Sequence, residues 1–498
     1  MPARPSDAPD NVPDFAPDFV DVLIIGAGLS GIGAAVHLRQ NCPHKSFALM
    51  EQQAELGGTW ALFKYPGIRS DSDMYTLGYS FKPWTDPKSI ADGPAILSYL
   101  HETVEEHKLG EHIEYNAKLL SADWDSASAQ WTARFEDGRI KRCNFLFMCS
   151  GYYSYAAGYS PDFAGSDEFG GDIIHPQHWP EALDYAGKNI VVIGSGATAV
   201  TLVPSLAKTA KQVTMLQRSP SYMGVKPSRD RFANALNTLL PHRLAYKIIR
   251  RKNTLINSLE YGFTRKKPET AKKVLLKMVK KELGPDYPYD PNFTPRYNPW
   301  DQRVCLVPDG DMFSAMKAGK AAVVTDHIER FDVRGVQLKS GAHLPADIII
   351  TATGLDLQLL GGAEFRVDGQ AVDFSQTYSY MGMMFSGVPN MASVFGYVNA
   401  SWTLRADLVS AYICRLLTHM EAANMPIGTP IAPAGMQARP WLDLSSGYIQ
   451  RALDKMPMQG DREPWLNLHN YARDRKMFPV KPVDDGAMVF SRPSRASR

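Results

Sequence analysis

Two glycine-rich segments are the residues of this chain that could bind a phosphate-bearing ligand. The first, Gly26-Ala-Gly28-Leu-Ser30-Gly31, follows an apolar run and opens a stretch of small residues typical of a helix. In this GxGxxG pattern the first glycine permits a tight turn, the second lets a pyrophosphate approach the backbone, and the third lets helix and strand pack closely. Glu51 ends the next apolar run, where a carboxylate can accept hydrogen bonds from ribose hydroxyls. The pattern predicts a dinucleotide site; a glycine-rich turn without a ligand is the alternative.

The second segment, Gly194-Ser195-Gly196-Ala197-Thr198-Ala199, repeats this arrangement with alanine in the third glycine position. Alanine still permits close packing of helix and strand. The following apolar run ends at Gln217-Arg218-Ser219, so no carboxylate stands where it would repel a 2′-phosphate. Because a guanidinium pairs with phosphate, Arg218 favours NADPH over NADH. The alternative is that Arg218 is an ordinary solvated arginine.

Two dinucleotide sites in one chain predict hydride transfer from NADPH to a flavin. The cysteines restrict which acceptor the reduced flavin can serve, because a disulfide reductase of this kind needs a Cys-x-x-Cys pair. The chain has five cysteines, all in isolated positions: Cys42, Cys143, Cys149, Cys305 and Cys414. We therefore expect free thiols in a reducing compartment, and neither a disulfide reductase nor a structural zinc site.

Two longer motifs indicate the chemistry of the flavin. Residues Phe169-Gly-Gly171-Asp-Ile-Ile-His175-Pro-Gln-His-Trp179-Pro180 match FxGxxxHxxxWP, and residues 57–71 match GGxWxxxxYPGxxxD without a gap. Together they resemble the fingerprint of the Baeyer–Villiger monooxygenases. Segments 65–78, 297–303 and 397–402 extend the resemblance over nearly the whole chain, toward the subfamily of the mycobacterial ethionamide-activating monooxygenase.

The resemblance implies a class B flavoprotein monooxygenase that uses FAD, NADPH and O2. In that family a C4a-peroxyflavin converts ketones to esters or lactones, and in its protonated form it oxidises sulfides or thioamides. The alternative is a flavin-containing N/S-monooxygenase that forms no ester. Trp179-Pro180 argues against this alternative, because those relatives usually carry another aromatic residue and lack the proline. A flavin-bearing binding or sensing protein without turnover is disfavoured by the two glycine loops together with Arg303.

The resemblance also places the catalytic arginine at Arg303, in the segment 297–303. A guanidinium stays charged, so it can stabilise the peroxide anion in a site closed to water. Asp71 would orient this arginine and contact the flavin. Many relatives have a lysine just before the arginine that helps to hold the 2′-phosphate. Gln302 occupies that position here, which weakens the argument for NADPH.

Further contacts are implied by the same motifs. His175 and Trp179 fall on the expected linker between domains, where they would couple domain rotation to the catalytic cycle; direct proton transfer by His175 is the alternative. We expect FAD to contact Gly26, Gly28, Ser30, Gly31, Glu51, Thr59, Trp60, Ala61, Leu62, Asp71 and Leu119. We expect NADPH to contact Arg69, Ser70, Gly194, Ser195, Gly196, Ala197, Thr198, Ala199, Val200, Arg218 and Ser219.

The elements that must position these residues are two βαβ units. Apolar runs predict strands at residues 21–25, 46–51, 142–150, 189–193, 212–217 and 347–353, and helices at 28–40 and 196–206. We predict an α/β fold with two Rossmann-like domains, the NADP domain being inserted into the FAD domain. The expected ranges are a disordered segment at 1–19, the FAD domain at 20–155 and 351–485, the NADP domain at 156–350 with a helical insertion at 226–292, and a flexible tail at 486–498.

Segment 226–282 has sixteen Lys/Arg against four Asp/Glu, with apolar residues at helical spacing. We interpret it as a solvated helical insertion; a surface for anionic lipid or for a partner is the alternative. The net charge of +2 argues against nucleic acid as a partner. With no signal peptide and no spanning run, we expect a cytoplasmic enzyme, peripheral membrane contact being the alternative. The substrate pocket is expected in the C-terminal half, where Tyr397, Trp402 and residues 381–384 supply apolar surface, although these residues could equally be core.

Overall fold

The larger of the two main sheets contains parallel and antiparallel strands and is built around the first strand of the chain. The computed structural model describes residues 18–302, 304–442 and 446–493. The buried apolar strands β2 (Phe47–Met50) and β6 (Ile140–Met148) pair in parallel with the two sides of β1 (Asp18–Ile25). Such double-sided burial is typical of a parallel sheet covered by helices. The strand order is β18-β17-β4-β5-β6-β1-β2-β3, and β21 also pairs with β6.

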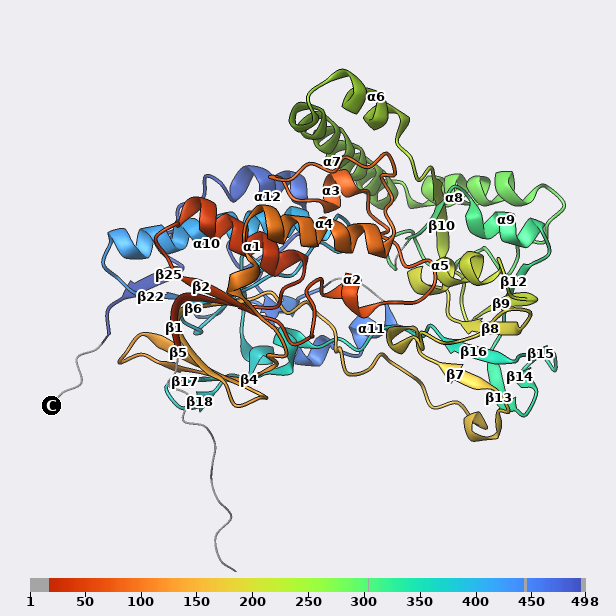
Figure 1. Cartoon of the computed structure of the whole chain (residues 1–498), viewed down its shortest axis with the longest axis horizontal. Coiled ribbons are helices and arrows are strands. Elements are labelled where there is room, and N and C mark those ends of the chain that lie inside the picture. Colours follow the sequence, from red (N-terminus) through yellow and green to blue (C-terminus); the bar gives the residue numbers. More distant parts are fainter. Residues whose placement is uncertain (1–17, 303, 443–445, 494–498) are drawn as a thin grey trace, which may run out of the picture.

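The second sheet is parallel throughout, in the order β12-β9-β8-β16-β7. Its strands are β7 (Asp172–Ile174), β8 (Asn189–Ile193), β9 (Gln212–Gln217), β12 (Ala321–Thr325) and β16 (Ile348–Thr351). After β16 the chain returns to the first sheet, where β17 (Glu364–Val367) pairs with β4 and β21 (Met391–Ser393) pairs with β6. The second sheet is therefore nested within the chain segments that build the first, which confirms the predicted fold class (Figure 1).

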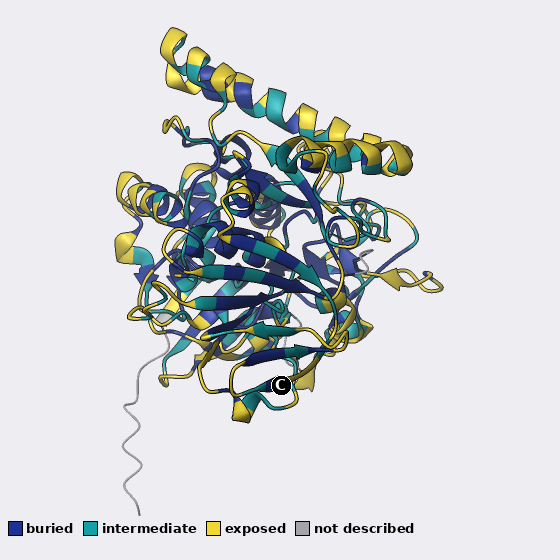
Figure 2. Cartoon of the chain, turned by 90° about the vertical axis from the view of Figure 1, so that its right-hand side faces the viewer, coloured by how far each residue is buried: buried dark blue, intermediate teal, exposed yellow. Residues whose placement is uncertain are grey.

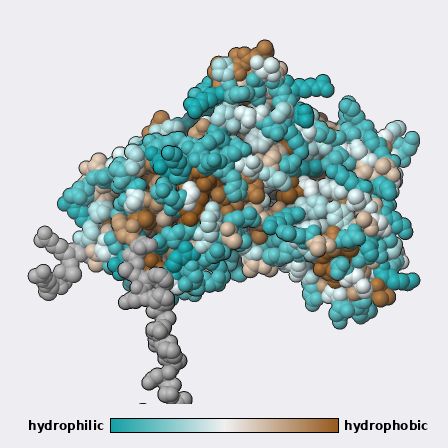
Figure 3. All heavy atoms as spheres, viewed as in Figure 1, coloured by the Kyte–Doolittle hydropathy of each residue, from teal (hydrophilic) through white to brown (hydrophobic). Residues whose placement is uncertain are grey.

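A helical layer is inserted in the chain between β10 (Tyr222–Lys226) and β11 (Val304–Pro308), two strands that pair with each other. It consists of α6 (Arg231–Leu239), α7 (His242–Lys266) and α8 (Pro268–Leu283), as the helical pattern of this segment predicts. Many of its residues are exposed (Figure 2). Apolar atoms gather on the tip of the molecule formed by α6 and the start of α7 (Figure 3).

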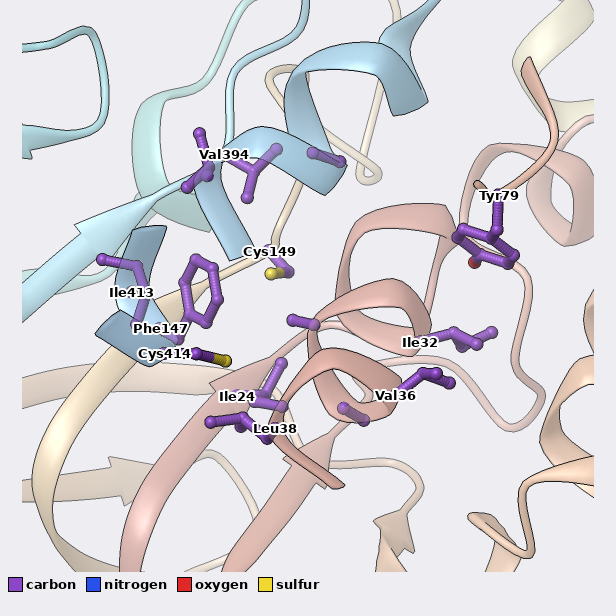
Figure 4. Packing of buried hydrophobic residues seen from close by; sticks show 14 of the residues in the cluster. Ile24, Ile32, Val36, Leu38, Tyr79, Phe147, Cys149, Val394, Ile413 and Cys414 are labelled. Atoms are coloured by element: carbon purple, nitrogen blue, oxygen red, sulfur yellow. The ribbon is translucent and has the colours of Figure 1, made fainter. Parts of the chain in front are cut away.

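The main core lies between the first sheet and two helices, α1 (Leu29–Asn41) and α10 (Trp402–Ala422). Small residues of α1 let it approach both neighbours: Leu38 lies beside Ile24 of β1, and Ile413 of α10 lies next to Phe147 of β6 (Figure 4). A separate apolar cluster is formed by side chains of the second sheet and of α5 (Ala197–Leu206). All five cysteines are buried and free, as predicted. None of the described helices is long and apolar enough to cross a membrane.

Both ends of the chain are more ordered than predicted. The prediction of disorder at 1–19 is wrong for Asp18 and Phe19, which pair with β6 as the start of β1; residues 1–17 lie outside the described residues. The prediction of a flexible tail at 486–498 is wrong for β25 (Met488–Ser491). This strand pairs antiparallel with β22 (Ile427–Pro430) and buries Met488, so hydrogen bonds and apolar packing both fix it. Residues 494–498 again lie outside the described part of the chain.

The remaining strands and helices complete the fold. The strands are β3 (Ile113–Glu114), β4 (Leu119–Asp125), β5 (Gln130–Phe135), β13 (Ile328–Asp332), β14 (Gly335–Leu338), β15 (His343–Pro345), β18 (Gln370–Ala371), β19 (Ser379–Tyr380), β20 (Met384–Phe385), β23 (Arg439–Pro440) and β24 (Met458–Gln459). The helices are α2 (Thr59–Leu62), α3 (Met74–Leu77), α4 (Gly93–Glu106), α9 (Asp311–Lys317), α11 (Gly447–Gln450) and α12 (Tyr471–Met477).

Candidate active site

The first glycine loop has the geometry that its sequence pattern requires. Gly26 has φ +105°, and a Cβ there would lie 2.6 Å from the carbonyl oxygen of Cys149. A Cβ on Gly31 would lie 1.8 Å from the carbonyl oxygen of Gly26. Real Cβ atoms do not approach backbone so closely, so no side chain fits at either position. The loop can turn from β1 into α1 only because both residues are glycine.

Glu51 closes this loop from the end of β2. Its Oε2 accepts a hydrogen bond of 2.7 Å from the N–H of Ala27, and its Oε1 accepts one of 2.9 Å from the N–H of Gln53. The side chain is buried, and this burial raises the pKa of the carboxyl while the backbone hydrogen bonds oppose the rise. Each carboxylate oxygen has a second lone pair, so Glu51 can also accept a hydrogen bond from a ligand hydroxyl in the adjoining cleft.

The second glycine loop, at the end of β8, has the same geometry as the first. Gly194 has φ +139°, and a Cβ there would lie 2.3 Å from the carbonyl oxygen of Ala352. Ser195 Oγ donates a hydrogen bond of 2.9 Å to the carbonyl oxygen of Ser219, which fastens the loop to the chain after β9. Ala199 is fully buried in the third glycine position. In each sheet, therefore, the chain segment that crosses between the sheets passes against the first glycine of the loop.

The helices that follow these loops offer free N–H groups. Helix α1 begins after Gly28 and α5 after Gly196, and neither glycine has a side chain to cap the first turn. A Cβ on Gly196 would meet no atom within 4 Å, so this loop faces open space. A helix N-terminus with uncapped N–H groups suits a diphosphate. The residues present thus fit two dinucleotides.

A cleft of about 680 Å³ runs along both loops. Eight of the residues predicted to contact FAD line it: Gly26, Gly28, Ser30, Glu51, Thr59, Trp60, Asp71 and Leu119. Four of those predicted for NADPH also line it: Arg69, Ser70, Ala197 and Thr198. The C-terminal end of β1 and the N-terminal end of α5 therefore face the same cleft.

The other predicted contacts lie beside this cleft rather than on its walls. Gly31 lies in the first turn of α1, and Ala61 and Leu62 lie on α2. Gly194, Ser195, Gly196, Ala199, Val200, Arg218 and Ser219 belong to the second loop and to the chain after β9. Among them Arg218 is exposed beyond the end of β9.

Several charged residues lie near the cleft. Arg69 forms an ion pair with Asp311 at the start of α9. Asp71 lines the cleft two residues further on and is exposed. Arg303, the predicted catalytic arginine, lies outside the described residues. Close to it in sequence, Asp301 accepts a hydrogen bond of 2.8 Å from Arg265 of α7.

Two antiparallel segments connect the sheets, and the FxGxxxHxxxWP motif packs on them. The N–H of Ser154 donates to the carbonyl oxygen of Asp356 at 2.8 Å, and the N–H of Tyr159 donates to that of Gly354 at 3.0 Å. The imidazole of His175 lies against Gly158, where a Cβ would approach the ring to 2.0 Å. Burial lowers the pKa of His175, so the ring is neutral near pH 7.

The rest of the motif is structural in the same way. Phe169 packs edge-on against Phe331, and Gly171 allows close passage past the carbonyl oxygen of Asp347. Trp179 packs on Tyr185 at the edge of the second core, and the exposed Pro180 follows it. The motif thus joins the connecting segments to the second sheet.

Comparison with known proteins identifies the family. Residues 20–283 match the flavin-binding monooxygenase-like family. The chain is 52% identical over 478 residues to the FAD-containing monooxygenase EthA of Mycobacterium tuberculosis, covering 95% of this chain and 98% of that protein. It is 47% identical over 483 residues to the probable FAD-binding monooxygenase AlmA of Acinetobacter baylyi, with 95% and 96% covered. The chain belongs to the flavin-binding monooxygenase-like family.

Solved structures of this flavin-binding monooxygenase's relatives have the same fold. An oxidized steroid monooxygenase bound to NADP superposes with a TM-score of 0.77 at 21% identity, covering 95% of this chain and 100% of that one. Cyclohexanone monooxygenase from Rhodococcus sp. Phi1 bound to NADP⁺ superposes with a TM-score of 0.70 at 22% identity, covering 83% and 87%. These likenesses show that the fold is shared.

Sequence reasoning expected Trp402 at the pocket but missed the contacts that it makes, and it missed two tyrosines of this monooxygenase's cleft. Trp402, at the start of α10, donates a hydrogen bond of 2.8 Å from its indole to Ser30 Oγ and stacks on Tyr152 at a centroid distance of 5.2 Å. Tyr153 shares a hydrogen bond of 2.6 Å with Thr59. Trp402 had a signal, since it ends the family segment 397–402, but Tyr152 and Tyr153 had none beyond their place after β6.

The walls of the cleft also differ from prediction. Tyr397 and Trp402 line it, as expected of the C-terminal half. Met381, Met383 and Met384 do not, because they are buried in the main core. Much of the outer wall comes instead from the helical insertion, through residues of α7 and α8 including Tyr261, Phe263, Val274 and Met278.

Proposed function

We propose that this protein is a Baeyer–Villiger monooxygenase that uses FAD, NADPH and O2 to convert ketones to esters or lactones. The observation that carries the proposal is the single cleft lined by residues from both glycine loops. A hydride can pass between two dinucleotides only if their reactive rings meet, and one shared cleft allows this. The family match and the Trp179-Pro180 ending of the fingerprint support the assignment.

The chain's own residues would divide the work between the two cofactors and the reacting centre. The N-terminus of α1 and Glu51 bind the FAD diphosphate and ribose, while the N-terminus of α5 and Arg218 bind NADPH. When bound, the flavin supplies the capacity to take hydride and to activate O2. Arg303 provides a fixed positive charge for the anion that forms, and Asp71 orients Arg303. The aromatic wall formed by Trp402, Tyr152 and Tyr153 excludes water from this space.

The apolar cleft wall supports ketones with hydrocarbon chains or rings, and sulfides or thioamides as secondary substrates. The purified protein should be yellow with one FAD per chain, and NADPH should bleach it under nitrogen. A panel of linear, cyclic and aryl ketones with sulfides, analysed by mass spectrometry, should give esters together with sulfoxides. A colourless protein with full activity would overturn the proposal.

The second candidate is an N/S-monooxygenase that forms no ester. The observation that favours it is the apolar wall itself, which would equally accept a sulfide. This candidate predicts that the same panel yields sulfoxides from sulfides and no ester from any ketone. The amount of NADPH consumed should equal the amount of sulfoxide formed.

A further inference from the structure

The outer face of helices α6–α8 carries a concentration of exposed apolar side chains. Of the eighteen large apolar residues that are exposed in the described part of the chain, ten fall between residues 232 and 278. On α7 they include Leu244, Ile248, Leu255 and Leu259, whose spacing puts them on one side of the helix. Leu255 is 60% and Leu259 63% exposed. We call this surface the α6–α8 face.

The segment that carries this face is strongly basic. Between residues 226 and 282, thirteen Lys/Arg side chains are exposed against two Asp/Glu, Glu260 and Glu269. Lys247 and Arg251 flank the apolar side of α7, and both are exposed. The whole chain has a net charge of only +2, so the positive charge is local to this segment. Apolar residues bordered by Lys and Arg are typical of a helix lying in the interface of an anionic membrane.

The α6–α8 face is continuous with the opening of the cleft. Phe263, Val274 and Met278 line the cleft and are also 40%, 42% and 37% exposed. They stand on the same two helices as the exposed apolar residues. The exposed apolar residues of this face therefore extend to the opening of the cleft.

Helix α7 is anchored on its opposite side. Arg250 donates hydrogen bonds of 2.9 Å to the carbonyl oxygen of Tyr75 and 2.6 Å to that of Gly78, and it forms a 3.2 Å ion pair with Asp407. Tyr246 donates a further hydrogen bond to the carbonyl oxygen of Tyr79. The orientation of α7 is therefore fixed, and its apolar side points away from the rest of the protein.

We propose that the α6–α8 face docks on an anionic phospholipid bilayer and that apolar substrates enter the cleft from the lipid. Leu255 and Leu259 insert among the acyl chains, while Lys247 and Arg251 lie among the headgroup phosphates. The docking itself is independent of the enzyme's activity. Substrate entry from lipid rests on the proposed function.

The docking is tested by flotation of the full-length protein with phosphatidylcholine vesicles, with or without phosphatidylglycerol. We expect binding to the anionic vesicles at low salt and weaker binding at high salt, since the attraction is screened. The double variant Leu255→Ser/Leu259→Ser should lower the partition coefficient at least about 10-fold, because it removes the buried apolar area. Val333→Ser/Val480→Ser changes two equally exposed residues elsewhere and should leave binding intact.

Charge reversal separates docking from general attraction to polyanions. Lys247→Glu/Arg251→Glu should abolish binding, whereas Lys208→Glu/Lys211→Glu, at exposed positions beyond α5, should not. If the serine variant binds as well as wild type, only charge acts and the apolar docking is wrong. If wild type does not bind anionic vesicles at low salt, the whole inference is wrong.

Entry from lipid is tested by kinetics. With a long-chain ketone carried in anionic vesicles, Leu255→Ser/Leu259→Ser should raise KM at least about 5-fold, with kcat and the KM for a short water-soluble ketone unchanged. Equal kinetics on the vesicle-borne ketone would overturn entry from lipid. If wild type oxidises neither ketone, the proposed function fails, while the flotation result still decides the docking.

Discussion

The indole N–H of Trp402 donates a 2.8 Å hydrogen bond to Ser30 Oγ, joining the start of α10 to the first turn of α1. This bond links the C-terminal part of the chain to the loop proposed to hold the FAD diphosphate. Trp402→Phe keeps the stack on Tyr152 but removes the donor. We expect the lost hydrogen bond to lower the unfolding free energy by about 1 kcal/mol and to give faster FAD release, measured by denaturant titration and flavin fluorescence.

Trp441→Phe provides the matched control. The Trp441 indole N–H is buried and has no hydrogen-bond partner in the described part of the chain. Both variants lose the same side-chain volume, but only Trp402→Phe also loses a hydrogen bond, so Trp402→Phe should lose about 1 kcal/mol more than Trp441→Phe. If both variants lose the same stability, the Trp402–Ser30 bond makes no specific contribution.

Gly31→Ala tests the packing of the first glycine loop. The new Cβ would lie 1.8 Å from the carbonyl oxygen of Gly26, so β1 and α1 must separate. We expect a loss of about 1–3 kcal/mol in unfolding free energy and little bound FAD after purification. Gly262→Ala, within α7, meets no atom within 4 Å and should stabilise the protein by about 0.5–1 kcal/mol. A fully yellow Gly31→Ala variant of wild-type stability would contradict this account.

The glycine loops were predictable from sequence because their requirements are local. Gly26 and Gly194 have a positive φ and a close backbone neighbour. The spacing of the glycines before the following helix indicates both requirements. The predicted strands 189–193 and 212–217 likewise match β8 and β9, because continuous apolar runs determine them.

Contacts between distant segments were not predictable in this way. Ser30 and Trp402 are 372 residues apart, and no pattern in either segment indicates the other. The order of β25 depends on its pairing with β22, some sixty residues earlier, so the tail looked flexible on composition alone. The insertion was recognised as helical, but its place on the cleft wall depends on how α8 packs on β10 and how α7 packs on α8.

Arg218→Ala tests the choice of nicotinamide cofactor. Arg218 is exposed at the end of β9, where only NADPH offers a 2′-phosphate. Loss of one charge-assisted pair should raise the KM for NADPH roughly 10-fold or more and leave that for NADH nearly unchanged. Lys208→Ala, beyond the far end of α5, is the control for loss of a positive charge. Equal effects of Arg218→Ala on both cofactors would assign the arginine another role.

His469 makes stability depend on pH. Burial, with a smaller contribution from Arg405, lowers the pKa of this imidazole to about 3. In the unfolded chain it binds a proton below about 6.5, but in the folded protein it does not. The unfolded state therefore gains protons as pH falls, and stability is lost from about pH 6.5 downward by up to about 1.4 kcal/mol per pH unit.

His469→Phe should remove this part of the pH dependence. Urea unfolding at pH 7.5 and pH 5.5 should show a smaller loss of stability for the variant than for wild type. His101→Phe changes an exposed histidine and should keep the wild-type difference. An unchanged difference in His469→Phe would mean that other groups cause the acid sensitivity.

Arg303→Ala tests the proposed catalytic centre. Arg303 lies outside the described residues, and the prediction rests on its place in the segment 297–303. FAD should bind normally, because the proposed FAD contacts come from the first glycine loop and Glu51. Ester formation should fall about 10²-fold or more, the scale of losing one preorganised charge at about 2.7–4 kcal/mol. NADPH oxidation should continue in part and release hydrogen peroxide, since activated oxygen is no longer directed to the ketone.

Arg296→Ala is the matched control, because it removes an exposed arginine from the same loop before β11. It should keep the wild-type ratio of ester to hydrogen peroxide. Arg303→Lys retains a positive charge but not the planar, multiple donors, so it should recover only part of the ester yield. These ratios are measured in one assay by following NADPH, peroxide and product together. If Arg303→Ala makes ester at the wild-type rate, another group stabilises the anion, and the catalytic role proposed for this arginine is wrong.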